Sequence, residues 1–141
     1  MNVVTLVVWL LTAVGGFTLV GIWLQHGGLD TTRSRRFPRS LPFAHAAAAV
    51  ISLVLFIVYW IADVDVLKPI VLIGLLLTAV LGITMFVQWV GKFRQPVPGS
   101  VGAASARPAE DDFPTVLVAI HGVAAVATLI LYIVAAFVVA S

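Results

Sequence analysis

Two histidines stand at corresponding places in two similar segments of the chain. His45 ends the segment FPRSLPFAH and His121 ends FPTVLVAIH, so both segments begin with Phe-Pro, carry leucine at the fifth position and end in histidine at the ninth. Both continue into a long apolar run that predicts a helix. A pair of imidazoles is suited to bind a metal such as haem iron, copper or zinc. Because the two histidines correspond, we expect them to act at one site.

The rest of the sequence is typical of a membrane protein. Of the 141 residues, 62% are hydrophobic and 10% are charged, whereas about 25% of the residues of a soluble domain are charged. Four apolar runs are long enough to cross a hydrocarbon core of about 30 Å. The predicted spanning helices are about residues 3–25, 41–62, 69–91 and 114–140. The absence of cysteine excludes disulfides, thiolate metal sites and covalently attached c-type haem.

The four predicted helices form an internal repeat. The runs LLTAVGGFTLVGIW and LLTAVLGITMFVQW agree at eight of fourteen positions, among them Gly16 and Gly82. Together with the histidine segments they define two tandem helical hairpins, at about residues 3–62 and 69–140. Two hairpins that enter a membrane in the same direction are related by a pseudo-twofold axis along the membrane normal. We therefore predict an all-α fold, an integral membrane four-helix bundle that forms a single transmembrane domain over residues 1–141.

Basic residues set the expected orientation in the membrane. They concentrate in the connections at residues 26–40 and 92–112, while the connection between these two has only Lys68. The positive-inside rule then places both long connections in the cytoplasm and the N- and C-termini outside. The second long connection is rich in proline, glycine, alanine and serine, so we predict a flexible loop at 92–112.

The first long connection also predicts a partner. It has four arginines between residues 33 and 39. They are expected to attract membrane lipid with anionic headgroups, and so short a basic run does not indicate binding of nucleic acid. The preference for arginine over lysine, with much alanine and valine, is typical of a GC-rich bacterium. The expected location is therefore the bacterial inner membrane.

Helical spacing groups small and polar residues with the two histidines. Ser52 follows His45 by seven residues and Thr128 follows His121 by seven, so each pair shares one helix face. Polar side chains in membrane helices usually face other protein groups. Glycines of the other two helices fall near the depth of the histidines. The residues expected to line the interior at this site are His45, His121, Gly16, Gly82, Ser52 and Thr128.

We predict that the two imidazoles bind one b-type haem from its two faces. The anionic propionates are expected at the cytoplasmic edge, where Arg35, Arg36 and Arg39 can pair with them. The arrangement of His45 and His121 resembles that of small membrane cytochromes of the b561 type and of the haem anchors of succinate dehydrogenase. The resemblance implies electron transfer, alone or as a subunit of a respiratory or reductase complex with other membrane subunits, rather than a stand-alone enzyme. Membrane b561 proteins typically hold two haems, but this chain has no second histidine pair.

Two other functions stay open. A histidine in a membrane helix often hydrogen-bonds to a neighbouring hydroxyl or carbonyl and has no further role. The protein would then be a non-catalytic accessory or assembly subunit of a larger membrane complex. A small transporter or channel is less favoured, because no proline or charge interrupts the middle of a helix. The haem hypothesis requires the second and fourth helices to lie diagonally and farther apart than the usual distance of about 8–10 Å, whereas in the accessory reading they touch.

Overall fold

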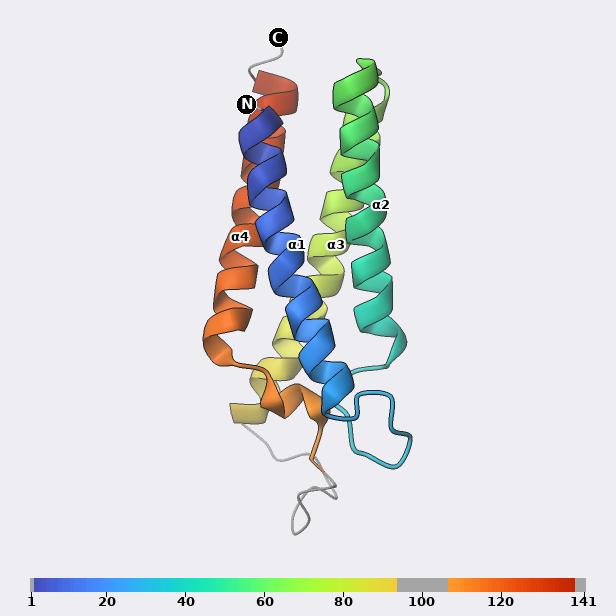
Figure 1. The fold of residues 1–141 in the computed structure, drawn as a ribbon, viewed down its shortest axis with the longest axis vertical. Helices are drawn as coiled ribbons and strands as arrows, with labels where there is room; N and C mark the ends of the chain where they lie inside the picture. Colours follow the sequence, from blue (N-terminus) through green and yellow to red (C-terminus); the bar gives the residue numbers. More distant parts are fainter. Residues whose placement is uncertain (1, 94–106, 139–141) are drawn as a thin grey trace.

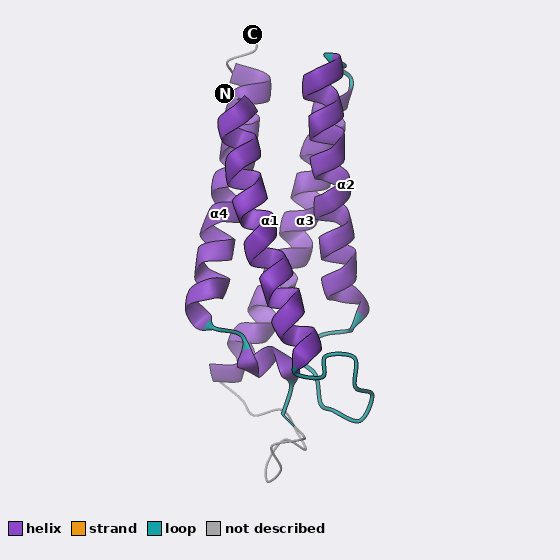
Figure 2. Cartoon of the chain, viewed as in Figure 1, coloured by secondary structure: helices purple, strands orange, loops and turns teal. Residues whose placement is uncertain are grey.

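The structure, a computed structural model, describes residues 2–93 and 107–138, and its regular elements there are all helical (Figure 2). The four long helices are α1 (Asn2–Gln25), α2 (Ser40–Ala62), α3 (Leu67–Val90) and α4 (Thr115–Ile133). The short elements are two 3-10 turns, η1 (Gly91–Phe93) and η3 (Ala109–Asp112), and the π-helical continuation of α4, η4 (Val134–Val138). All four helical segments are long and apolar enough to span a membrane.

The bounds of α2 and α3 follow from their end residues. Asp63 ends α2 in the left-handed conformation, with φ 52° and ψ 43°, and its N–H donates to the carbonyl of Tyr59. A short polar side chain makes aspartate one of the few residues that adopt this conformation readily. α3 begins at Leu67, two residues before Pro69, which the sequence analysis placed at the helix start. Proline is tolerated there because the N–H groups of a first turn have no intrahelical partner. The predicted end of the fourth helix, 139–140, lies outside the described residues.

The helices pack as two pairs. α2 packs chiefly against α3, and α1 chiefly against α4, while α1 with α2 and α3 with α4 make weaker contacts. Among the described helices, α2 and α4 share at most marginal contact. Figure 1 shows them on opposite sides of the bundle, with α1 in front and α3 behind. α1 starts and α4 ends at the same end as the α2–α3 turn, and the two long connections lie at the other end.

An aromatic cluster fills the bundle toward the α2–α3 turn. Trp9 stacks on Phe56 with 5.4 Å between ring centroids, and Phe56 meets the edge of Tyr132 at 5.8 Å. These rings are buried, and the hydroxyl of Tyr132 donates to the carbonyl of Lys68 at 2.7 Å. The half of the bundle toward the long connections holds two helical glycines and two histidines, and the buried rings of Trp23 and Trp89 lie at its end.

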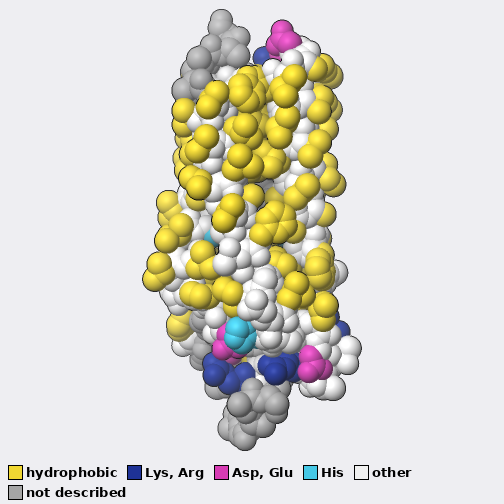
Figure 3. Space-filling model, viewed as in Figure 1, with side chains coloured by type: hydrophobic (Ala, Val, Ile, Leu, Met, Phe, Trp, Pro, Cys, Tyr) yellow, Lys and Arg dark blue, Asp and Glu magenta, His cyan; other side chains and the backbone are white. Residues whose placement is uncertain are grey.

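The sides of the bundle are apolar and its charges lie at its ends. Figure 3 shows hydrophobic side chains along the length of the helices, with Lys, Arg, Asp and Glu at the two ends and most of them at the end of the long connections. Large apolar side chains such as Ile61 and Val123 are 77% and 71% exposed. A helical bundle whose sides are apolar all along its length has the surface that a hydrocarbon environment requires.

The end of the second long connection closes the bundle. Residues 94–106 of the predicted flexible loop lie outside the described residues, but η3 packs against α1 and buries Ala109 and Glu110. The indole N–H of Trp23 donates to Glu110 Oε1 at 3.1 Å. The guanidinium of Arg36 binds both carboxylate oxygens of Asp111, with Nη2 at 3.1 Å from Oδ2. Residues from both long connections are thus joined across one end of the bundle.

Candidate functional site

The two histidines singled out from the sequence meet inside the bundle. The ring centroids of His45 on α2 and His121 on α4 lie 6.2 Å apart, with 73° between the ring planes, and both side chains are partly buried. Nδ1 of His45 lies 2.9 Å from the carbonyl oxygen of Thr78, and Nδ1 of His121 lies 3.0 Å from that of Thr12. A carbonyl only accepts, so each Nδ1 carries the proton and donates. In the neutral imidazole the lone pair is then on Nε2, which is the atom that can bind a metal.

Glycine four residues after threonine gives each imidazole its access to the neighbouring helix. A helical carbonyl already accepts from the N–H four residues later, and its second lone pair is usually shielded by that residue's side chain. At Thr12 that residue is Gly16, and a Cβ built there would lie 2.9 Å from Cε1 of His121. Gly82 has the same relation to His45, at 3.0 Å. Because both glycines lack a side chain, each imidazole packs directly against the backbone of the neighbouring helix.

We expect Gly16→Ala to destabilise the bundle by about 1–3 kcal/mol, as overpacking of a close contact does. The added methyl group would displace the imidazole of His121 and weaken its bond to the carbonyl of Thr12. Gly21→Ala is the matched control on the same helix, because a Cβ there meets nothing within 4 Å. Alanine is favoured over glycine in a helix by about 1 kcal/mol, so the control should be neutral or stabilising. Thermal unfolding of the purified variants in detergent measures both effects. Equal unfolding midpoints for the two variants would contradict the close packing of His121 against Gly16.

Ser52 and Thr128 lie farther from the imidazoles, at the contacts within each helix pair. Both are buried, and both hydroxyls donate to the carbonyl four residues earlier on their own helix. The hydroxyl of Thr128 also lies 3.1 Å from that of Thr12. Ser52 packs against Gly74, where an added Cβ would lie 2.2 Å from its Oγ. Seven residues of helix separate each hydroxyl from its histidine by about 10 Å, so these side chains contribute to helix packing.

The predicted propionate partners make contacts of their own. Arg36 is engaged by Asp111, as described above. Nη2 of Arg39 donates to the carbonyl of Asp30 at 2.6 Å. Hydrogen bonds from the hydroxyl and amide of Thr32 hold the pKa of the Asp30 carboxyl below its usual range, and the nearby arginine charges act in the same direction. Asp30 is therefore ionised at neutral pH and anchors the first long connection.

Sequence reasoning missed one buried acid. Glu110 is 1% exposed, and besides the indole of Trp23 it accepts a long hydrogen bond of 3.5 Å from the backbone N–H of Arg36. Three consecutive acids occur at this point of the chain, and nothing in their order distinguishes the buried one. The third histidine, His26, is exposed, and its Nδ1 bonds to the carbonyl of Ile22 at 2.8 Å.

The two imidazoles are the candidate metal ligands of this site. In the described part of the chain, no group of three or more His, Asp and Glu side chains is placed to hold a metal ion. The pair therefore suits a group that brings its own equatorial ligands, as haem does. Comparison with known proteins adds no relative, because no family model, curated protein or solved structure matches the chain.

Proposed function

We propose that this is a multi-pass membrane protein that binds one b-type haem between His45 and His121 and transfers electrons. The observation that carries the proposal is the facing pair of imidazoles, each held by its Nδ1 to a backbone carbonyl of the neighbouring helix. The proposal includes the bacterial inner membrane as location, with the basic end of the bundle in the cytoplasm. That orientation follows from the basic residues at one end (Figure 3) and the positive-inside rule.

The spacing of the imidazoles fits two axial ligands of one metal. A bond between a metal and an imidazole nitrogen is about 2 Å long. The centre of each ring lies about 1 Å beyond that nitrogen, so two imidazoles that bind one metal from opposite sides have ring centres about 6 Å apart. The observed separation is 6.2 Å. An angle of 73° between the ring planes fits as well, because each imidazole can rotate about its own metal–nitrogen bond. The minimal contact between α2 and α4 is also what the haem hypothesis requires.

The hydrogen bonds of Nδ1 support the same role. A metal-ligating histidine almost always donates its other ring N–H to a carbonyl, carboxylate or water, which fixes the ring and raises its basicity. Both histidines here do so. A zinc ion would need at least one further protein ligand, and the described residues place none beside the pair. Haem is therefore favoured over a bare metal ion.

We also infer that the two halves of the chain are related by a pseudo-twofold axis. The α1·α4 and α2·α3 contacts are each made by a threonine carbonyl, the glycine four residues later and a histidine of the partner helix. The residues are Thr12, Gly16 and His121 in one pair of helices and Thr78, Gly82 and His45 in the other. These are the residues that correspond in the sequence repeat, so the same three-residue contact supports the axis.

The chemistry that a bound haem would supply here is a one-electron redox couple. His45 and His121 would hold the haem through Nε2, and their Nδ1 bonds to the carbonyls of Thr78 and Thr12 would keep both rings in place. The apolar helix faces exclude water. His45 and His121 lie near the starts of α2 and α4, so a haem held between them would lie toward the basic end of the bundle. Electrons would then be exchanged with a partner subunit at that end.

A visible spectrum tests this function. Protein purified in detergent from haem-replete cells should give a reduced-minus-oxidised difference spectrum with the Soret and α bands of a low-spin b haem. Quantifying haem against protein should give one haem per chain. A featureless spectrum would overturn the proposal, and two haems per chain would overturn the single site.

The accessory subunit is the second candidate. It is favoured by the same carbonyl bonds, because they tie α1 to α4 and α2 to α3 without any ligand. In that case the spectrum is featureless, and a tagged protein should purify together with other subunits of a membrane complex. A transporter gains no support, since Pro42 and Pro69 both lie in the first turns of their helices.

A further inference from the structure

The first long connection forms a shallow, open cavity lined by arginines just before α2. Its volume is about 370 Å³, and its walls are Arg35, Arg36, Phe37, Pro38 and Arg39. It lies at the basic end of the bundle, where the apolar sides of the helices stop (Figure 3). The haem proposal rests on the contacts of the two histidines and not on this cavity, although its predicted propionate partners line the cavity. The inference below does not depend on haem.

Two of the arginines here are held by acids. Arg36 is engaged by Asp111 through Nε and Nη2. Arg33, which follows the turn at Asp30, pairs with that carboxylate at 3.7 Å and donates to the carbonyl of His26 at 3.0 Å. These two guanidinium groups therefore have intramolecular partners for their charge.

The other two arginines, which also line the cavity, are not paired with an acid among the described residues. Nε of Arg39 is buried and finds no acceptor among the described residues, although its Nη2 donates to the carbonyl of Asp30. Arg35 is exposed, and within the described residues no carboxylate pairs with it. A buried guanidinium N–H without an acceptor is unfavourable, so an anion in the cavity would satisfy it. The positive end of the α2 dipole adds to the attraction, because no side chain caps that helix.

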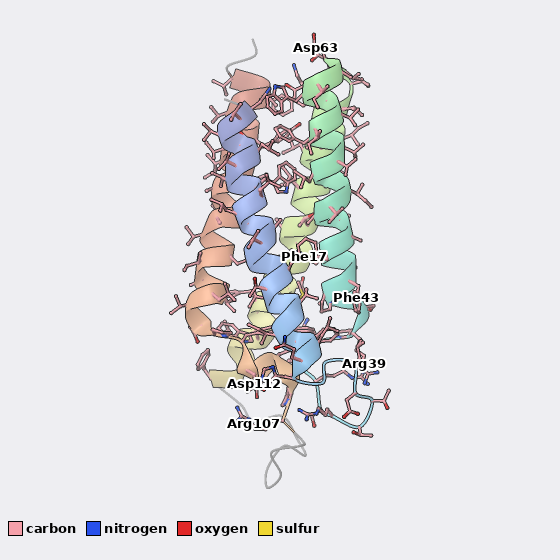
Figure 4. All side chains as sticks on the ribbon, viewed as in Figure 1. Phe17, Arg39, Phe43, Asp63, Arg107 and Asp112 are labelled. Atoms are coloured by element: carbon pink, nitrogen blue, oxygen red, sulfur yellow. The ribbon has the colours of Figure 1, made fainter. Side chains whose placement is uncertain are left out.

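The walls combine positive charge with apolar surface. Phe37 and Pro38 line the cavity beside the arginines, and Phe43, one turn into α2, is 46% exposed. Figure 4 shows Arg39 and Phe43 on the same side of the bundle. A phosphodiester next to an acyl chain matches this combination, since arginine binds phosphate through its planar fork. We propose that the cavity binds the phosphate of an anionic phospholipid headgroup.

The test is titration of the detergent-purified protein with short-chain phosphatidylglycerol, followed by native mass spectrometry of the retained lipid. Wild type should retain one lipid that inorganic phosphate does not displace. Arg39→Gln and Arg35→Gln should each weaken retention about tenfold, the effect of losing one charge-assisted hydrogen bond. Arg107→Gln is the matched control. Arg107 is exposed at the same end of the bundle (Figure 4) and carries the same charge, so its loss should leave retention near the wild-type value.

Three results would overturn the proposal. Equal weakening by Arg39→Gln and Arg107→Gln would mean a general charge effect. Displacement of the lipid by inorganic phosphate at similar concentration would mean a site for free phosphate. Unchanged lipid retention with lower haem content in Arg39→Gln would assign this guanidinium to a haem propionate instead.

Discussion

Replacing either His45 or His121 by alanine should remove the haem from the purified protein, whereas replacing His26 should leave it in place. Each imidazole has its Nδ1 proton committed to a carbonyl and offers Nε2 as the single nitrogen available to iron. Loss of one ring removes one of two axial ligands in a site where no third histidine can substitute. His26 is exposed at the basic end and bonds to the carbonyl of Ile22. Haem per chain should fall from about one to near zero in the first two variants.

A rescue experiment separates ligation from a structural role. The side chain of His121 is replaced by a methyl group in the alanine variant, which leaves space for a free imidazole beside Gly16. Imidazole added during haem loading should restore a low-spin spectrum if the ring is an axial ligand. If the ring of His121 only links α1 to α4, free imidazole should not restore the spectrum, because it is not attached to α4. Retention of the full α band in both alanine variants, or equal loss in all three, would contradict the assignment.

The helices could be predicted from the sequence because long uncharged runs have few alternatives. Their pairing could not. The repeat defines two hairpins, and consecutive helices are the natural neighbours, yet α1 packs mainly on α4. The neighbour of α1 depends on whether Gly16 faces a helix, a ligand or an imidazole. The sequence indicates only that this glycine lines the interior of the bundle. In the structure Gly16 faces the imidazole of His121, because a Cβ built on this glycine would lie 2.9 Å from Cε1 of that ring.

The contacts that close the basic end of the bundle could not be predicted from the sequence either. Asp111 belongs to a stretch of proline, alanine and acids whose composition predicts flexibility. Its partner Arg36 lies in the other long connection, and only the folded bundle brings the two together. The same holds for Glu110 and Trp23, because a buried acid can be recognised only from the groups that surround it. Charge pairs between two loops carry no periodic signal in a sequence.

Asp111→Asn should cost about 1.5–3 kcal/mol of unfolding free energy, the usual effect of removing hydrogen bonds between charged groups that are partly buried. The side chains of Arg36 and Asp111 are 7% and 14% exposed, so water replaces little of the lost interaction. Asparagine keeps the shape of the side chain and removes its charge. Asp112→Asn is the matched control, because Asp112 is the exposed neighbour. The control should change stability by less than about 0.5 kcal/mol.

Unfolding of the variants in mixed micelles with increasing dodecyl sulfate would measure the difference. Trp23 is a suitable probe, because its indole N–H bonds to Glu110, the residue before Asp111. The double variant Arg36→Gln, Asp111→Asn should lose less than the sum of the two single losses, as directly coupled groups do. Additive losses, or equal stability of the two asparagine variants, would show that the pair contributes little to closure.

The same variants distinguish two roles of Arg36, closure of the bundle and pairing with a haem propionate. If its guanidinium serves the closure alone, Asp111→Asn and Arg36→Gln should lower stability together and leave haem content unchanged at low temperature. If instead it pairs with a haem propionate, as the sequence analysis predicted, Arg36→Gln should lower haem content while Asp111→Asn, which frees the guanidinium, should not. Both oxygens of Asp111 already engage Nε and Nη2 of Arg36, so a propionate would have to compete with a bidentate carboxylate. We therefore expect the first result.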